Sequence, residues 1–360
     1  MPSKKSLSEK IDAYRSFWSR ESVSRPIIGF DAGGFFPLSH FKSLGSLGPG
    51  DLLTPQHIRP SDFLADYERL YEQSQRIDDD FIRGVSPLTA FPWMEAMLGC
   101  SAQLAEASIW AVERDAEWQE LESISIADEN PWLQKYLEFL RVLSDYAAGR
   151  FPVSQPILRG VTDIIGALRG HDQALVDGLE SPERIRSLGA RCAEALVSVL
   201  KRHFEIVQPF LDGYVVEQYC LWAPGQIARL QEDASSIYSP DMYVDLIQES
   251  DRLVASSFPL SMIHLHSSSL FIIDAFLEIE EIDVFQVNRD VGGVELREML
   301  PALKKILDSN RSLILRGPLT EDDLRLAKAN LDPRGLLIQI VVDHEREASR
   351  FHDVIDTLWR

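Results

Sequence analysis

Residues 258–269 read FPLSMIHLHSSS and join an apolar run to His264 and His266. Such a run predicts a buried strand. Because side chains alternate along a strand with a period of two, the two imidazoles would leave it on the same face. At the carboxyl end of a strand in a parallel barrel, that face is the mouth, where barrel enzymes keep their catalytic groups.

Short apolar segments alternate with amphipathic stretches along almost the whole chain. Most of the apolar segments are continuous, which is typical of parallel strands covered on both faces. Several amphipathic stretches begin with Ser or Thr followed by Pro or acidic residues, which suit the free N–H groups of a helix start. The predicted strands are 27–30, 81–84, 153–158, 214–217, 260–264, 284–287, 313–315 and 336–341. The predicted helices include 61–76, 181–204, 239–253 and 320–331.

Eight strands with intervening helices predict an α/β protein, a single domain over residues 1–360 folded as a (β/α)8 TIM barrel. An open doubly wound sheet is the alternative. No glycine-rich GxGxxG turn follows the first strand, which disfavours that alternative.

Two connections are longer than ordinary loops. Residues 31–60 form a Gly/Pro-rich loop after the first strand, and residues 85–150 form an insertion after the second. We predict a hairpin (107–112 with 118–126) and a helix (131–148) within the insertion. Long βα loops on a barrel usually cover the active site.

The composition narrows the class of function. A net charge of −20 over 360 residues disfavours nucleic acids and anionic membranes as partners and leaves a small-molecule substrate. The chain shows no signal-peptide pattern and no apolar run long enough to span a bilayer. Its three cysteines, Cys100, Cys192 and Cys220, show no CxxC spacing. We therefore expect a cytoplasmic protein.

Several segments, in order along the chain, resemble the uroporphyrinogen decarboxylase superfamily. They are FPWMEAMLGC (91–100), ILRGVTDIIGALRG (157–170), SPERIRSLGARCAEAL (181–196), WAPGQIARLQEDASSIYSPDMYVDLI (222–247) and MIHLHSSS (262–269). The resemblance implies a (β/α)8 barrel, in agreement with the element count. Members of this superfamily include the haem-pathway decarboxylase and zinc-dependent methyltransferases that act on methylated corrinoids and thiols.

The motifs of the decarboxylase itself are altered. Where that enzyme resembles R-Q-A-G-R-Y-L-P, this chain has Phe30 and Gly34 in place of the two arginines that hold substrate carboxylates. Residues 84–88, GVSPL, also lack the aspartate of the enzyme's F-S-D-I-L segment. A porphyrinogen with eight carboxylates needs charge-assisted partners, so its decarboxylation is disfavoured. Metal-free decarboxylation of another small carboxylic acid stays an alternative.

The methyltransferase motif is retained with one changed ligand. Those enzymes resemble H-x-C-G after the fifth strand, and here the matching residues are His264-Leu265-His266-Ser267. Imidazole can replace thiolate as a zinc ligand. The resemblance places a third ligand after the eighth strand, where His344 or Asp343 would serve. It implies zinc as the cofactor, a corrinoid protein as a candidate partner and a homodimer as a candidate assembly.

Other polar residues near strand ends complete the candidate site. Asp31 and Glu217 are candidate catalytic carboxylates beside the two histidines. Candidate substrate-binding residues are Asp233, Asn288, Arg289, Arg316 and Trp222. Each has a plainer interpretation, as a turn residue, an ion-pair partner or a packing residue, and the histidines could simply be hydrogen-bonded to backbone. A small-molecule-binding barrel without catalysis is therefore a further alternative.

Overall fold

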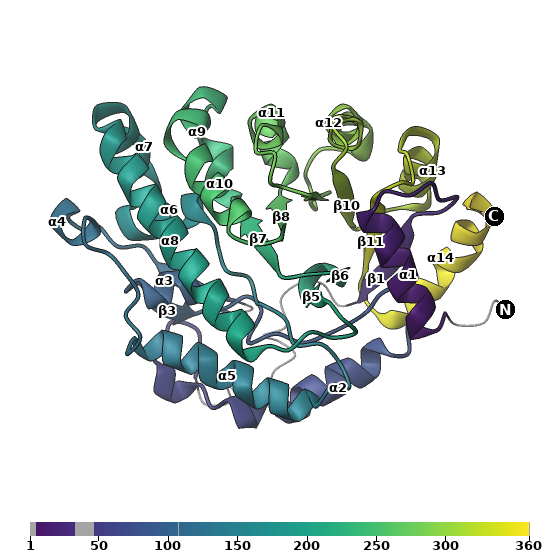
Figure 1. Cartoon of the computed structure of the whole chain (residues 1–360), viewed down its shortest axis with the longest axis horizontal. Helices are drawn as coiled ribbons and strands as arrows, with labels where there is room; N and C mark the ends of the chain where they lie inside the picture. The colour runs from purple at the N-terminus through teal and green to yellow at the C-terminus, as the bar shows by residue number, and fades with distance from the viewer. Residues whose placement is uncertain (1–4, 33–46, 107, 360) are drawn as a thin grey trace.

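The computed structural model describes residues 5–32, 47–106 and 108–359. Its main sheet has six parallel strands in the order β1-β11-β10-β9-β8-β7, and Figure 1 shows helices arranged along the outside of these strands. The strands are β1 (Ile27–Ala32), β7 (Ile227–Gln231), β8 (Leu260–Leu265), β9 (Val284–Asn288), β10 (Ser312–Gly317) and β11 (Leu336–Val342). All six are almost continuously buried, which explains their apolar sequences.

The helices that follow the strands pack against the outer face of the sheet. Thr320 caps one of them, since its hydroxyl accepts the N–H of Asp323 while the Asp323 carboxylate accepts the N–H of Thr320. These helices are α6 (Val161–Arg169), α7 (His171–Glu180), α8 (Pro182–Ile206), α9 (Pro240–Leu246), α10 (Gln248–Ser256), α11 (Ile273–Leu277), α12 (Leu296–Asp308), α13 (Glu321–Asn330) and α14 (Glu345–Leu358).

Two extended segments lie between the edge strands β1 and β7. The Asp80 N–H donates to the Ile28 carbonyl over 3.2 Å, so the first segment runs beside β1. Val85 pairs in parallel with Val153, which joins the two segments. The Gly160 N–H donates to the Gln231 carbonyl over 2.8 Å, so the second segment leads on to β7. Hydrogen bonds thus link both edges of the sheet through the segments 79–85 and 152–160.

These segments were predicted as regular strands, at 81–84 and 153–158, and that detail is wrong. The structure gives them one bridge instead of a ladder. Pro152 and Pro156 have no N–H to donate, and aspartate side chains replace part of the ladder. The carboxylates of Asp79 and Asp80 accept the N–H groups of two residues of β1, Phe30 and Ile28.

The predicted fourth strand, 214–217, is also misplaced. Residues Tyr214–Val216 form β5, which pairs antiparallel with β6 (Leu221–Ala223) in a separate hairpin joined by a 3-10 turn at Glu217–Tyr219. The strand of the main sheet at this point is β7, which the prediction omitted. Its sequence IARLQ carries Arg229 and Gln231, so it does not stand out as an apolar run.

The insertion differs from the prediction in one element. Residues Ile109–Val112 form β4, but β4 pairs with β3 (Ser101–Leu104) and not with 118–126. Residues Trp118–Leu121 form the short helix α4, and residue 107 of the predicted hairpin lies outside the described residues. The predicted helix is present as α5 (Pro131–Ala147). The other elements are β2 (Leu52–Leu53), α2 (Leu64–Ser74) and α3 (Trp93–Met97).

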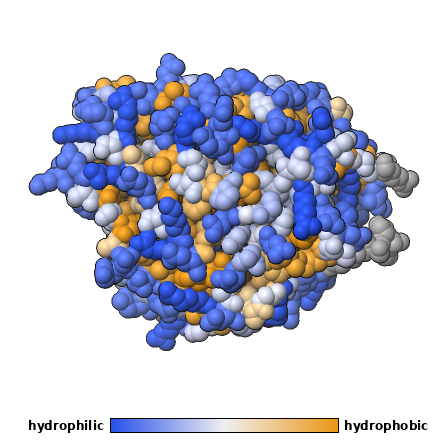
Figure 2. Space-filling model, in the orientation of Figure 1, coloured by the Kyte–Doolittle hydropathy of each residue, from blue (hydrophilic) through white to orange (hydrophobic). Residues whose placement is uncertain are grey.

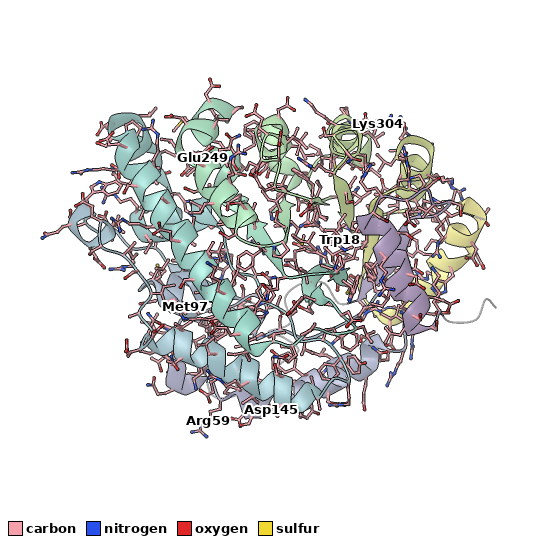
Figure 3. The ribbon with its side chains drawn as sticks, viewed as in Figure 1. Trp18, Arg59, Met97, Asp145, Glu249 and Lys304 are labelled. Atoms are coloured by element: carbon pink, nitrogen blue, oxygen red, sulfur yellow. The ribbon has the colours of Figure 1, made fainter. Side chains whose placement is uncertain are left out.

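Helix α1 (Leu7–Trp18) and the β5–β6 hairpin fill the end of the sheet where the strands begin. Ile11, Tyr14 and Phe17 of α1 belong to one buried cluster with Val216 and Leu221 of the hairpin. The cluster also holds one residue from each of the six strands of the main sheet: Ile27, Ile227, Met262, Val284, Ile314 and Leu337. Trp18, labelled in Figure 3, donates its indole N–H to the Trp222 carbonyl over 2.7 Å. We call this buried cluster the apolar floor. It closes the end of the sheet where the strands begin, so the polar side chains gather at the opposite end, where the strands finish.

The surface seen in Figure 2 is largely hydrophilic, with smaller areas of exposed apolar side chains among the charged ones. In the described part of the chain, no helix is long and apolar enough to cross a bilayer. The three cysteines are buried and form no disulfide.

A substitution at Gly29 of β1 would test how segment 79–85 packs on the sheet. A Cβ added at Gly29 would lie 2.4–2.6 Å from three ring atoms of the buried Phe81, so the ring or the segment must shift. We expect Gly29→Ala to lower the free energy of unfolding by ~2 kcal/mol in urea denaturation. Gly48→Ala is the control, because nothing lies within 4 Å of its added Cβ. Equal stabilities of the two variants would contradict the packing.

Candidate functional site

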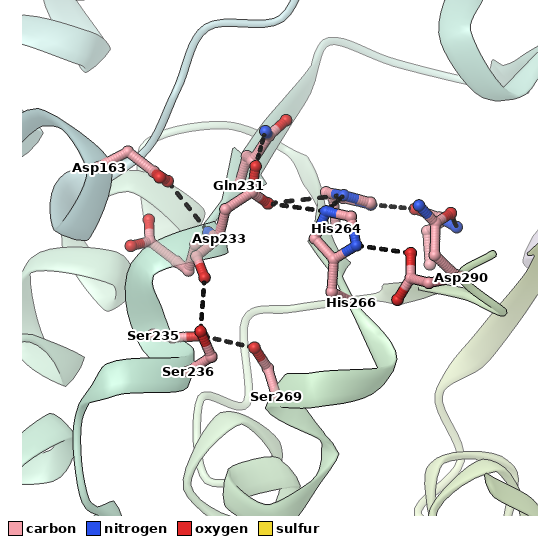
Figure 4. Close-up of polar contacts among 12 residues, drawn as sticks. Asp163, Gln231, Asp233, Ser235, Ser236, His264, His266, Ser269 and Asp290 are labelled. Atoms are coloured by element: carbon pink, nitrogen blue, oxygen red, sulfur yellow. Dashed lines mark hydrogen bonds and ion pairs between the residues drawn. The ribbon is translucent and has the colours of Figure 1, made fainter. Parts of the chain in front are cut away.

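Three side chains converge at the carboxyl ends of β7 and β8 (Figure 4). The Nε2 atoms of His264 and His266 lie 3.4 Å apart. Oδ1 of Asp233 lies 3.6 Å from each of these two nitrogens. The two rings leave the end of β8 on the same face, and Asp233 begins the turn that follows β7. We call these three residues the triad.

Each imidazole is held through its other nitrogen. Nδ1 of His264 pairs with Oε1 of Gln286, whose amide Nε2 donates to Oδ1 of Asn288 over 2.9 Å. Because that bond fixes the amide, Oε1 faces His264 as an acceptor and Nδ1 carries the proton. Nδ1 of His266 pairs with Oδ1 of Asp290 over 2.7 Å. Both Nε2 lone pairs are thereby directed toward Asp233.

Asp233 is positioned by its neighbours but keeps one oxygen without a hydrogen bond. Its Oδ2 accepts the amide of Gln231 over 2.5 Å, and its backbone N–H donates to Asp163 over 3.0 Å. Its Oδ1 is buried and accepts no hydrogen bond from any described residue. Burying a carboxylate oxygen in this way is costly unless something compensates for it. A cation bound between this oxygen and the two imidazole nitrogens, which lie 3.6 Å from it, would compensate for the loss.

The pKa values of the two histidines are shifted in opposite directions. Burial, only partly offset by Asp233, lowers the pKa of His264 to about 3, so this ring is neutral. The hydrogen bond to Asp290 raises the pKa of His266. Burial opposes ionisation of Asp290, but the hydrogen bonds from His266 and Ser267 outweigh it and lower its pKa to about 2.

The triad has the donors and the spacing of a zinc site. Zinc takes imidazole nitrogen and carboxylate oxygen at about 2.0–2.2 Å, which in a tetrahedron puts donor atoms roughly 3.4 Å apart. The observed separations of 3.4, 3.6 and 3.6 Å match this value. Three protein donors leave a fourth position for a substrate or water, as in catalytic zinc sites. A zinc ion bound by the triad would also give the unpartnered Oδ1 of Asp233 a partner.

A separate cavity of about 590 Å³ opens beside the triad's end of the sheet. Its lining comes from the end of β1, from α2 and Ile77, from residues 83–89, from the tip of the β5–β6 hairpin, and from β11 and the residues after it. Asp31 and Glu217, the two predicted catalytic carboxylates, lie in it, and none of the triad does. Asp31 pairs with Arg316 over 2.6 Å.

Other predicted residues lie away from the triad. His344 is exposed, 3.7 Å from Glu347, and together with Asp343 it lines the mouth of the cavity. The triad thus takes its third member from the turn after β7 and not from the residues after β11.

The remaining candidates are engaged elsewhere. Arg289 pairs with Glu295 over 2.8 Å, and Asn288 accepts the amide of Gln286. Trp222 is buried in the apolar floor and donates its indole N–H to the Phe210 carbonyl over 3.0 Å. Its place in the floor explains its burial without a substrate contact.

The residues that hold the triad were missed in the sequence. Gln286 and Asp290 have no motif around them, although the end of β9 did stand out as polar. Asp163 lies in the segment 157–170 that resembles the superfamily, but no role was predicted for it. Asp233 was predicted as a substrate contact because β7, which positions it, was not recognised. Had IARLQ been read as a strand, Asp233 would have stood beside His264 at the same edge of the sheet.

Comparison with known proteins supports the fold. No family model matches the chain, and no curated protein matches its sequence. Among solved structures, a methyltransferase from Methanosarcina mazei shares 12% sequence identity and superposes with a TM-score of 0.66. The match covers 97% of this chain and 98% of that chain. At this identity the likeness extends to the fold: an α/β architecture with a parallel sheet and many helices.

The environment of Glu217 predicts that the stability of the protein depends on pH. Burial and the nearby Asp31 charge raise the pKa of Glu217 to about 7, against about 4.3 in an unfolded chain. The folded protein therefore favours the neutral carboxyl, and this contribution to stability is lost as the pH rises through 7. We expect the stability of Glu217→Gln to rise relative to that of the parent protein between about pH 4 and pH 7 in urea denaturation, and the difference to level off above about pH 8. A stability difference independent of pH would contradict the raised pKa.

Proposed function

We propose that this chain is a (β/α)8 barrel of the uroporphyrinogen decarboxylase superfamily and acts as a zinc-assisted methyltransferase. The segments 79–85 and 152–160 would be the second and third strands, which close the sheet into a barrel over a single domain, 1–360. Their hydrogen bonds to both edge strands support closure. Residues 85–150 would be an insertion within that domain. The methyltransferase from Methanosarcina mazei, which matches over nearly the full length, supports the choice of architecture.

One observation carries the proposed chemistry: two imidazole nitrogens and an unpartnered carboxylate oxygen form a triangle with sides of 3.4–3.6 Å. His264, His266 and Asp233 would hold the zinc. A zinc ion bound there would lower the pKa of a thiol or water in its fourth position. The donor set has no thiolate, which makes the site harder than a cysteine-containing one.

The chain's own residues have defined tasks in this proposal. Gln286 and Asp290 hold the two rings with their Nε2 atoms free. Gln231 donates to the carboxylate of Asp233, and the carboxylate of Asp163 accepts the backbone N–H of Asp233. A protein carrying a methylated corrinoid is the partner that the superfamily resemblance suggests. Nothing in the structural comparison supports the decarboxylase alternative.

Metal content tests the site directly. We expect protein purified without chelators to contain about one zinc ion per chain by elemental analysis. Loss of a residue that supports a metal ligand typically weakens metal binding by roughly 10- to 100-fold. Loss of a ligand itself should have a larger effect, so we expect His264→Ala and Asp233→Ala each to weaken zinc binding by more than roughly 100-fold. His344→Ala is the control, since it removes a histidine outside the triad. Folded parent protein without affinity for zinc, or an equal loss in the control, would refute the site.

Methyl transfer can be tested separately on the zinc-loaded protein. We expect the zinc-loaded protein to accelerate the transfer of the methyl group from methylcobalamin to 2-mercaptoethanol. The change in cobalamin absorbance measures the rate. His264→Ala should abolish the acceleration, and His344→Ala should retain it. Zinc binding without any acceleration would reject methyl transfer between these substrates while leaving the metal site in place.

A further inference from the structure

The cavity beside the triad combines an apolar wall with an excess of hydrogen-bond acceptors. Phe30, Leu70, Tyr71, Ile77 and Val85 provide most of the apolar lining. At about 590 Å³, the cavity lies within the range of pockets that bind small molecules. Such pockets fix the orientation of a ligand by a few polar groups, and those groups indicate what the ligand must carry.

Glu217 is the first of these groups. Its Oε2 lies within hydrogen-bonding distance of the hydroxyls of Ser86 (3.3 Å) and Thr89 (3.4 Å). Its other oxygen, Oε1, accepts no hydrogen bond from the described residues. No Lys or Arg of the described chain forms an ion pair with this carboxyl group. Glu217 is therefore an acidic group that lines the cavity and has no counter-ion in the part of the chain that the structure describes.

The glutamines beside it are also short of donors. Gln339 is 1% exposed, and its Nε2 donates to the backbone carbonyl of Gln218 over 3.2 Å. That bond fixes the amide and leaves Oε1 of Gln339 buried without a partner among the described residues. Oε1 of Gln218 is buried and unpartnered in the same way. Within residues 5–32, 47–106 and 108–359, two amide oxygens and one carboxyl oxygen around this cavity thus have no hydrogen-bond donor.

The largely buried arginine of the cavity lining is already neutralised, because Arg83 is held by Asp79 at 2.5 Å. The lining residue Asp31 is likewise paired with Arg316, at 2.6 Å. The other lining arginine, Arg346, is exposed to solvent and stands next to Glu345 in the chain. An anionic ligand would meet the carboxyl group of Glu217. The net charge of −20 for the whole chain acts in the same direction.

We propose that this cavity binds a small organic amine in its protonated form, with Glu217 as the counter-ion and Gln339 as an acceptor for its N–H groups. The apolar part of the amine contacts Phe30, Tyr71 and their aliphatic neighbours. An ammonium group supplies the donors that the cavity lacks and favours the ionised form of Glu217. Aromatic rings in the wall also favour a cation over a neutral molecule.

This site is independent of the proposed methyl transfer, because it shares no lining residue with the triad. Amine binding should therefore survive in His264→Ala and in protein treated with a chelator. Failure of the metal site would leave the amine site intact, and the reverse also holds.

The proposal can be tested by calorimetric titration of the full chain with three ligands that share a benzyl-sized ring but differ in their polar group. We expect benzylamine to bind at least about tenfold more tightly than benzyl alcohol, and benzoate not to bind. Glu217→Gln should weaken benzylamine roughly tenfold and change benzyl alcohol little. Gln339→Met, which removes the unpartnered acceptor at similar side-chain length, should weaken benzylamine several-fold and gives a second variant should Glu217→Gln fail to fold.

Glu345→Gln is the matched control, because it removes one negative charge at the mouth of the same cavity, from a side chain paired with Arg76. Screening by solvent should limit its effect on benzylamine to about twofold. Equal affinities for amine and alcohol, no binding of any probe, or an equal loss in Glu345→Gln and Glu217→Gln would each overturn the proposal.

Discussion

The parallel register of β7, β8 and β9 is the constraint on which the triad depends. Gln231 lies opposite His264, and His264 lies opposite Gln286, so three neighbouring strands present polar side chains at one level. A slip of one residue in any strand would turn its side chain to the other face of the sheet. The apolar floor at the beginning of the strands fixes this register, because each strand contributes a buried aliphatic residue or methionine to it.

Much of this arrangement can be predicted from the sequence, because burial on both faces leaves continuous apolar runs. Strands β8 to β11 were recognised on that basis, and the spacing of His264 and His266 predicted their common face. The same reasoning failed for β7, whose inward side chains are Arg229 and Gln231, and without that strand Asp233 could not be placed. It also failed where aspartates and prolines replace a strand ladder. The cavity could not be predicted, since its character depends on which acceptors lack a donor after folding.

A chain of polar contacts joins the β5–β6 hairpin to the triad. Buried Arg229 donates to the hydroxyl of Tyr219 over 3.1 Å and to Oε1 of Gln231 over 2.5 Å. With its oxygen so engaged, Gln231 must turn its Nε2 toward Asp233, and this settles the orientation of that amide. No carboxylate pairs with Arg229 among the described residues. Its positive charge therefore stays available to stabilise the nearby carboxylate of Asp233, whose Oδ1 is buried.

The hairpin tip also places the two proposed sites relative to each other. Residues Glu217–Tyr219 form one 3-10 turn, in which Glu217 faces the cavity and the ring of Tyr219 stacks on His264 with centroids 6.0 Å apart. A single turn, anchored in the apolar floor, thus contributes to both. Tyr219 and the next residue, Cys220, belong to the buried cluster of the floor, and this packing holds the turn in one position. The turn therefore separates the cavity from the triad while it supports both, so that each site can take its own ligand without the other.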